Sequence, residues 1–237
     1  MRHHAAVKIE GWNVIDQDAA ILWREYSFSK GAYATTLVFR GADGLVVVSP
    51  GMEVEPRAYD ALADLGKVRA LIANNALHSG GQKAWRERFP EAESYCPPGA
   101  VAALEKKVPG VRFRPLSDLA LPGHVRWEDA PGFKTGETIL SVDAKQGPVW
   151  YTSDLLTNIQ RPGGPPFSWV LSWTDSAPGF RLFKPAVWFM MKDKKAVREW
   201  TLARLDKDPP AVVVPAHGPA FEAADIVEQT RVQIQRL

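Results

Sequence analysis

Apolar and polar positions alternate with two different periods along the chain, which separates β-rich from helical stretches. Residues 19–28 are rich in β-forming side chains, and residues 35–51 contain two apolar runs on either side of Asp43-Gly44. This dipeptide is typical of hairpin turns because glycine accepts the positive φ that the turn requires. Residues 55–66 predict a helix, since apolar side chains recur at helical spacing, a proline occupies the first turn and Gly66 suits the end.

The same two patterns continue through the rest of the chain. Short apolar runs predict buried strands, and apolar positions three or four residues apart predict helices. Further strands are expected at residues 68–73, 93–96, 124–130, 137–144, 147–154 and 210–218, and further helices at 80–90, 97–108, 193–205 and 221–237. Two β-rich segments, each followed by helices, indicate two sheets packed face to face with helices outside. We therefore predict one α/β domain over residues 1–237.

A stretch rich in proline and aromatic residues, at about 158–191, interrupts this order as an insertion. It closely follows a predicted strand end at Asp154, so we expect it to lie over the same face of the molecule. Its aromatic side chains, Trp169 and Trp173 among them, suit the wall or lid of a pocket for an apolar ligand. They equally suit an extra packing layer or the contact surface of a homodimer. The sequence leaves these alternatives open.

Composition and charge restrict the classes of partner. The 237 residues include 29 basic and 27 acidic side chains, a formal charge of +2, and no long basic block, so nucleic acid is not an expected partner. The N-terminal segment, with His3 and His4 to which we assign no role, lacks the apolar core of a secretory signal. No apolar run approaches the roughly 18–20 residues of a membrane span. These features predict a cytoplasmic protein without stable membrane insertion.

Cys96 is the only cysteine of the chain. A single cysteine excludes an intrachain disulfide and fits a reducing compartment. It precedes a predicted helix, where a thiolate would be favoured. A small buried residue at a strand end is the simpler interpretation.

Three predicted strands lead to side chains that can bind a metal. The strand at 68–73 leads to His78, the strand at 147–154 ends at Asp154, and the last strand ends at His217. Open α/β architectures place ligands beyond the carboxyl ends of their strands, so these side chains are expected to converge. Two imidazoles and one carboxylate are enough to hold one divalent ion and leave positions open for water and substrate. Each residue alone also suits a structural role, as a hydrogen-bonded histidine or a capping aspartate.

Five segments resemble motifs of the metallo-β-lactamase fold superfamily. Residues 45–51 (LVVVSPG) resemble a strand that usually ends in an aspartate and a glycine, and residues 71–81 (LIANNALHSGG) resemble the signature H-x-H-x-D-H followed by two glycines. Residues 130–142 (APGFKTGETILSV) resemble the G-H-T-x-G segment, residues 149–156 (VWYTSDLL) the strand with the bridging aspartate, and residues 212–218 (VVVPAHG) the final P-x-H-G. The resemblance spans nearly the whole chain and implies a four-layer αββα sandwich.

The chain departs from this signature at four positions. Aligned on the glycine pair, the first two signature histidines are replaced by Ala73 and Asn75, and the signature aspartate is replaced by Leu77. Phe133 stands in place of the G-H-T histidine. The resemblance assigns the three missing histidines to the first metal of a two-metal site, so we expect that metal position to be absent.

The second metal position keeps most of its ligands. The resemblance assigns to it the signature aspartate, which is Leu77 here, together with His78, Asp154 and His217, which the chain retains. These three are the residues that the strand ends select independently. We therefore expect a mononuclear site, with zinc as the default ion, although two histidines and a carboxylate also suit iron or manganese. A metal-free pocket is the alternative.

A site of this reduced kind supports two functional hypotheses. In the first, an ion on the three ligands activates water, with Asp154 and His78 in the catalytic role, and the protein hydrolyses a small ester, lactone, thioester, amide or phosphoester. In the second, the fold binds a small molecule or a protein partner without catalysis, because Leu77 cannot accept a proton. The candidate pocket residues are Asn74, Asn75, Phe133, Trp169 and Trp173. The two asparagines also suit a loop whose side chains bond to the local backbone.

Overall fold

A computed structural model describes residues 8–237, apart from the side chains of Lys8 and Phe167; His3 and His4 lie outside this range. Its first sheet contains eight strands, each hydrogen-bonded to the next along the chain. Strands β1 to β5 pair antiparallel, and β5 to β8 pair parallel. The bounds are β1 (Lys8–Ile9), β2 (Trp12–Asp16), β3 (Ile21–Ser29), β4 (Ala32–Arg40), β5 (Leu45–Val48), β6 (Val68–Ile72), β7 (Glu93–Cys96) and β8 (Phe113–Pro115).

The second sheet is built around one long strand, β11. An antiparallel path runs from β9 through β10 and β11 to β12, and β13 pairs parallel with β11. The bounds are β9 (Val125–Asp129), β10 (Thr138–Ala144), β11 (Gly147–Ile159), β12 (Gly179–Leu182) and β13 (Val212–His217). Because β11 and β13 run in the same direction, their carboxyl ends lie at the same edge of the sheet.

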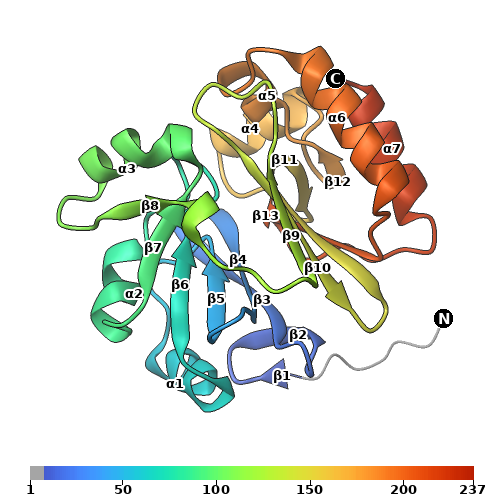
Figure 1. Cartoon of the computed structure of the whole chain (residues 1–237). Coiled ribbons are helices and arrows are strands. Elements are labelled where there is room, and N and C mark those ends of the chain that lie inside the picture. Colours follow the sequence, from blue (N-terminus) through green and yellow to red (C-terminus); the bar gives the residue numbers. More distant parts are fainter. Residues whose placement is uncertain (1–7) are drawn as a thin grey trace.

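Helices cover the outer faces of both sheets (Figure 1). Helices α1 to α3 lie beside the first sheet, α6 and α7 lie beside the second, and α4 and α5 lie at one end of the second sheet. The bounds are α1 (Pro56–Leu65), α2 (Gln82–Arg88), α3 (Val101–Lys107), α4 (Phe167–Trp173), α5 (Lys184–Phe189), α6 (Lys194–Lys207) and α7 (Ile226–Gln235), with short 3-10 turns at η1 (Pro98–Ala100) and η2 (Leu116–Asp118).

Buried apolar side chains form a layer between the sheets and a layer under the helices on each side. The central layer joins both sheets, for example Leu37 and Ile72 from the first with Leu140 and Val214 from the second. Leu62 and Trp85 belong to the layer under α1 and α2, and Val197 and Ile234 belong to the layer under α6 and α7. Each sheet is thus apolar on both faces, which requires the order helix, sheet, sheet, helix. The predicted four-layer αββα sandwich is confirmed.

The last helix differs from the prediction at its start. We expected it to begin at Phe221, but α7 begins at Ile226. The backbone of Phe221 exchanges two hydrogen bonds with Val213, and its ring stacks on Phe180 with 4.3 Å between centroids. Residue 221 is therefore tied to the second sheet in an extended conformation, which postpones the helix.

The proline- and aromatic-rich segment contains regular elements that the sequence pattern did not predict. Strand β11 continues through Asp154 to Ile159, and the segment then supplies α4, β12 and α5. Strand β12 pairs antiparallel with the last residues of β11, so part of the segment extends the sheet. Prolines at positions 162, 165, 166 and 178 keep each element short and hide its period.

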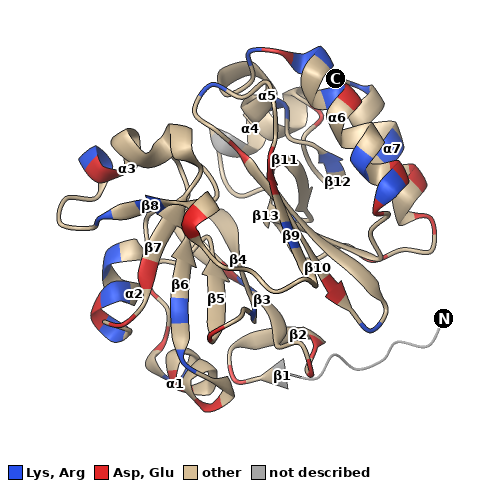
Figure 2. Ribbon diagram, in the orientation of Figure 1, with Lys and Arg blue, Asp and Glu red and all other residues tan. Residues whose placement is uncertain are grey.

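Charged side chains of both signs cover the outer helices, whereas the strands between the layers are mostly uncharged (Figure 2). No helix formed by residues 8–237 is long and apolar enough to cross a membrane.

Candidate metal site

The structure brings His78, Asp154 and His217 together. One candidate ligand atom from each lies within 4.8 Å of the other two, and all three residues are buried. The Nε2 atom of His217 lies 3.0 Å from Asp154 Oδ1, and the Nε2 atom of His78 lies 3.1 Å from Asp154 Oδ2. Within residues 8–237, this is the one group of three or more His, Cys, Asp or Glu residues with this spacing.

A local irregularity of β11 turns Asp154 toward the histidines. We expected the strand to end at Asp154, but it continues to Ile159. Its pairing with β13 shifts register on both sides of Ser153, which adopts a positive φ of 51°. Such irregularities redirect the neighbouring side chain. Asp154 therefore reaches the site from within a strand, and the bulge replaces the strand end that the sequence suggested.

Each histidine is held through its other ring nitrogen. The Nδ1 atom of His217 donates to the backbone carbonyl of Tyr33 at 2.8 Å. The Nδ1 atom of His78 lies 2.9 Å from Ser49 Oγ, and Ser49 Oγ lies 3.1 Å from the hydroxyl of Tyr26. Partners of this kind fix ring orientation and leave Nε2 facing the site, as in metal-ligating histidines. Sequence reasoning missed Ser49 and Tyr33, although Ser49 lies in the strand segment that resembles a family motif.

The glycine after His78 and Ser79 permits the His78–Ser49 contact. A Cβ atom on Gly81 would lie 2.3 Å from the backbone oxygens of both Pro50 and Gly51. The chain after His78 therefore approaches the backbone after Ser49 more closely than any side chain allows. Trp85 strengthens the same contact, since its Nε1 donates to the Gly51 carbonyl at 2.9 Å.

Asn75 connects the site to a second acidic residue. Its Nδ2 donates to Asp154 Oδ2 at 2.7 Å and to Glu137 Oε2 at 2.9 Å. Its Oδ1 accepts from the backbone N–H groups of Leu77 and His78 at 2.7 and 3.2 Å. The amide thus shapes the loop that carries His78 and orients the Asp154 carboxylate at the same time.

Glu137, and not Phe133, faces the position from which a histidine is missing. Phe133 is buried in the apolar layer under α6, whereas Glu137 is fully buried beside Asn75. The expectation that Phe133 replaces the G-H-T histidine is therefore corrected. Gly136-Glu137-Thr138 also matches G-x-T, and this second match was the signal that could have identified Glu137.

Charge and burial act in opposite directions on the two acids. Burial raises the pKa of the Asp154 carboxyl, but the charges and hydrogen bonds of His78 and His217 outweigh burial and hold that pKa well below its usual range. Burial and the charge of Asp154 raise the pKa of Glu137 well above its ordinary value. Glu137 therefore holds a proton at pH values where an exposed glutamate has lost it.

The electrostatics also favour the charged form of His217. Burial lowers the pKa of His217, but its hydrogen bond to Asp154 and the charge of that carboxylate more than offset burial and raise it. The lone pair of a neutral His217 Nε2 would face a carboxylate oxygen at 3.0 Å, because its Nδ1 is committed to the Tyr33 carbonyl. Two electron-rich atoms at this distance call for a cation, which is either a proton or a metal ion.

The candidate ligands lie at the base of a largely apolar cavity of about 510 Å³. Lys107 is the one lysine or arginine in its lining, and no acid other than Asp154 lines it. Leu77 lies at the rim and is exposed. The lining comprises Tyr26, Phe28, Ala34, Met52, Leu77, His78, Gly80, Lys107, Asp154, Phe183, Pro185, Ala186, Phe189, Met190 and His217.

The five predicted pocket residues do not line this cavity. Asn74 and Asn75 are buried beneath the ligands, where Asn74 donates to Ser153, and Phe133 lies in the core. Trp169 and Trp173 project into solvent from α4. The aromatic-rich segment instead supplies Phe183, Pro185, Ala186, Phe189 and Met190, from α5 and its flanking residues. The segment forms a cavity wall, as one of our alternatives expected, but with different side chains.

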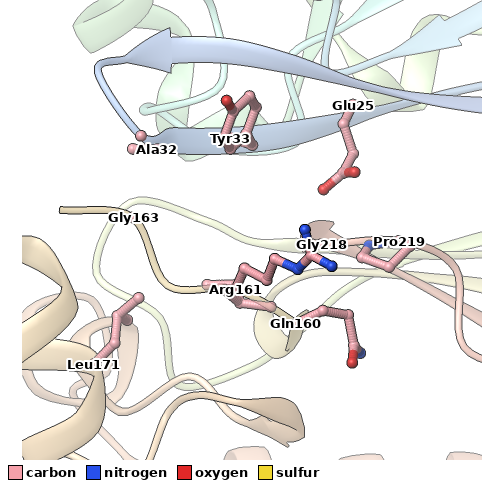
Figure 3. A pocket seen from close by; sticks show the side chains of 11 residues that line it. Glu25, Ala32, Tyr33, Gln160, Arg161, Gly163, Leu171, Gly218 and Pro219 are labelled. Carbon is pink, nitrogen blue, oxygen red and sulfur yellow. The ribbon is translucent and has the colours of Figure 1, made fainter.

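A second cavity, of about 230 Å³, lies on the other side of Gly218 (Figure 3). Glu25 from β3 and Arg161 from the loop after β11 extend toward one another across it. Its lining contains no histidine or cysteine, so it offers nothing to a transition metal.

Comparison with solved structures identifies the architecture. The chain matches a metallo-β-lactamase from Erythrobacter litoralis with a TM-score of 0.61 and 11% identity, covering 98% of this chain and 100% of that one. It matches the mono-zinc form of the metallo-β-lactamase FIM-1 from Pseudomonas aeruginosa with a TM-score of 0.57 and 11% identity, covering 98% and 94%. The chain has the metallo-β-lactamase fold. The resemblance noted in the sequence is confirmed at this level.

The metallo-β-lactamase fold by itself does not select a reaction. The chain also matches a fragment of a putative diflavin flavoprotein from Nostoc sp., with a TM-score of 0.59 and 14% identity, covering 97% of this chain and 95% of that one. No protein-family model and no curated protein matches the amino-acid sequence. Function must therefore be argued from the site.

Proposed function

We propose that this protein is a metal-dependent hydrolase with one divalent ion held by His78, Asp154 and His217. The observation that carries the proposal is the convergence of three ligand atoms at the base of a cavity, with each imidazole fixed through Nδ1. Zinc is the expected ion, and iron and manganese suit the same donors. The mono-zinc form described for one structurally similar protein is consistent with a single ion.

The surrounding residues suit such an ion. When bound, a divalent ion in this position would polarise a carbonyl or phosphoryl oxygen and lower the pKa of a water. The chain orients the donors: Ser49 and the Tyr33 carbonyl hold the imidazoles, and Asn75 holds the carboxylate. The apolar walls exclude bulk water and favour a small ester, lactone, thioester or phosphoester with an apolar body.

One feature of the cavity supports a second candidate function, the binding of an apolar small molecule without turnover. Leu77 stands at the rim where the resemblance places an aspartate, and the amide of Asn75 is already bonded to two acids. Apart from the candidate ligands, Tyr26 and Lys107 are the ionisable groups in the lining. A cavity with so few groups for proton transfer suits a binding protein as well as a slow hydrolase.

Metal analysis tests the proposed site. Protein purified without a chelating column and supplied with zinc, iron or manganese is expected to retain one ion per chain. His78→Ala and His217→Ala should each abolish this retention, whereas His124→Ala, in an exposed loop, should not. Ser49→Ala should weaken metal affinity by about 10–100-fold, because Ser49 orients His78. A folded wild-type protein that retains none of the three metals would refute the proposal.

Turnover separates the hydrolase from the binder. The metal-loaded protein is tested on esters, lactones, thioesters and phosphoesters with apolar groups, with Asp154→Ala as the inactive reference. Hydrolysis that disappears in this variant supports the enzyme. Metal retention and ligand binding without hydrolysis of any substrate class would favour the second candidate.

A further inference from the structure

An aromatic surface lies beside the mouth of the cavity. It consists of Trp169 and Trp173 on α4 and Trp188 and Phe189 on α5, and we call it the α4–α5 surface. Trp173 is 82% exposed, Phe189 is 74% exposed and Trp169 is 68% exposed. Trp169 and Trp173 are one helical turn apart, and the ring of Trp173 meets that of Trp188 at 5.9 Å. Large apolar side chains gathered on one surface in this way indicate a contact partner.

Unpaired lysines surround the same surface. Lys134 donates to the backbone carbonyl of Phe189, Lys184 begins α5, and Lys107 lines the cavity together with Phe189. Lys192 follows α5 on the loop to α6, where Figure 2 shows basic positions. None of these four lysines forms a salt bridge within the described part of the chain.

The acidic residue at the end of α4 does not offset these lysines. Asp175 bonds to Arg236, and its other oxygen lies 3.5 Å from Arg181. The α4–α5 surface therefore combines exposed tryptophans with a local excess of positive charge, although the whole chain carries a formal charge of only +2.

We propose that the α4–α5 surface binds the surface of an anionic lipid bilayer. Tryptophan is favoured at the boundary between lipid and water because its ring is both apolar and polar, and nearby lysines attract anionic head groups. A second copy of the chain fits less well, because a two-fold contact through this surface would bring the lysines of both copies together. The binding is peripheral, since no helix of residues 8–237 could cross the bilayer.

The position of the surface indicates what the cavity receives. Phe189 belongs both to the surface and to the cavity lining, and exposed Phe28 and Leu77 line the same mouth. A protein bound in this orientation would open its cavity toward the acyl chains of the membrane. On the basis of the proposed function, the substrate is then a lipid-like ester, while the membrane contact itself does not depend on catalysis.

Vesicle flotation with the metal-free full chain tests the membrane contact. Wild-type protein is expected to float with mixed phosphatidylcholine–phosphatidylglycerol vesicles, to float less with pure phosphatidylcholine, and to dissociate at high salt. Trp173→Ser with Trp188→Ser should lower the affinity by about tenfold or more. Lys134→Glu with Lys192→Glu should lower it by about 30-fold or more.

Matched substitutions elsewhere control for general effects on hydrophobicity and charge. Val232→Ser on α7 removes an exposed apolar side chain, and Lys83→Glu with Lys207→Glu makes the same charge change on α2 and α6. These variants should retain vesicle binding within about threefold. Equal loss in control and test variants, or no binding of folded wild-type protein, would overturn the proposal. So would a wild-type dimer that Trp173→Ser with Trp188→Ser converts to monomers without any change in flotation.

Discussion

Asn75 allows two acids to share one buried site. A charged Glu137 beside a charged Asp154 would be costly in this environment, and the amide between them can donate to both. The result is an unequal pair, in which Asp154 is a carboxylate paired with histidines and Glu137 keeps its proton. The positions that resemble the first metal site thus contain a hydrogen-bonded Asn75–Glu137 pair.

Glu137→Gln should stabilise the metal-free protein at alkaline pH. The folded state raises the pKa of Glu137 above its ordinary value of 4.5, so the folded chain binds more protons than the unfolded chain above that pH. Wild-type stability contributed by this group is therefore present below pH 4.5 and is lost as the pH rises. Glutamine keeps the acceptor for Asn75 but does not titrate.

Thermal unfolding at acidic and alkaline pH measures this effect. At alkaline pH the Tm of Glu137→Gln should exceed that of wild type by about 2–4 °C or more, and the difference should shrink toward pH 4.5. Glu222→Gln, at an exposed position, should leave the Tm unchanged at both values. A Tm difference that stays constant with pH would contradict a raised pKa for Glu137.

Helix α2 begins where two loops touch, and this contact sets the position of His78. The helix is only seven residues long, so packing and not helix propensity must hold it. Trp85 packs against Tyr59 with 4.8 Å between ring centroids and donates to Gly51. The glycine pair before the helix lets the backbone reach Pro50 and Gly51.

Gly81→Ala should separate the two loops. The added methyl group would overlap the backbone oxygens of Pro50 and Gly51, neither of which can move as a side chain can. We expect the free energy of unfolding to fall by about 1–3 kcal/mol in urea titrations. Gly123→Ala is the matched control, because a Cβ atom there meets nothing within 4 Å, and it should change stability by less than about 0.5 kcal/mol. Equal stability of the two variants would show that the loops are not in contact.

For the whole molecule, one apolar layer unites strands from both halves of the sequence. Residues of the first sheet, such as Phe39 and Val48, pack with Val142 and Tyr151 of the second. Neither sheet could keep this face from water alone. This sharing supports our prediction that residues 1–237 form one domain, and a single cooperative unfolding transition would agree with it.

The buried thiol of Cys96 provides a measure of global opening. Cys96 lies at the end of β7 among Ala73, Leu104 and Phe113, and burial raises its pKa to about 12. The thiolate expected from its place before a helix is therefore not favoured. At pH 8 the folded protein should react with an aromatic disulfide reagent about a hundredfold or more slowly than the protein in urea. Reaction of the folded protein at the unfolded rate would place the thiol at the surface.

The sequence by itself determined the layers and the three candidate ligands. Apolar periodicity reports which faces of each element are buried, and this local information is enough to predict two sheets with helices outside. His78, Asp154 and His217 could be selected because each follows or ends an apolar run. Convergence at one edge then follows from the general placement of ligands in α/β folds.

Only the tertiary structure decided which other side chains surround these ligands. Phe133 and Glu137 are four residues apart, and sheet pairing, not local pattern, brings Glu137 beside Asn75. Trp169 and Phe189 are both aromatic residues of the same segment, yet only Phe189 lines the cavity. The direction of a side chain depends on register, bulges and the packing of short elements between prolines, and these involve residues far apart in the chain.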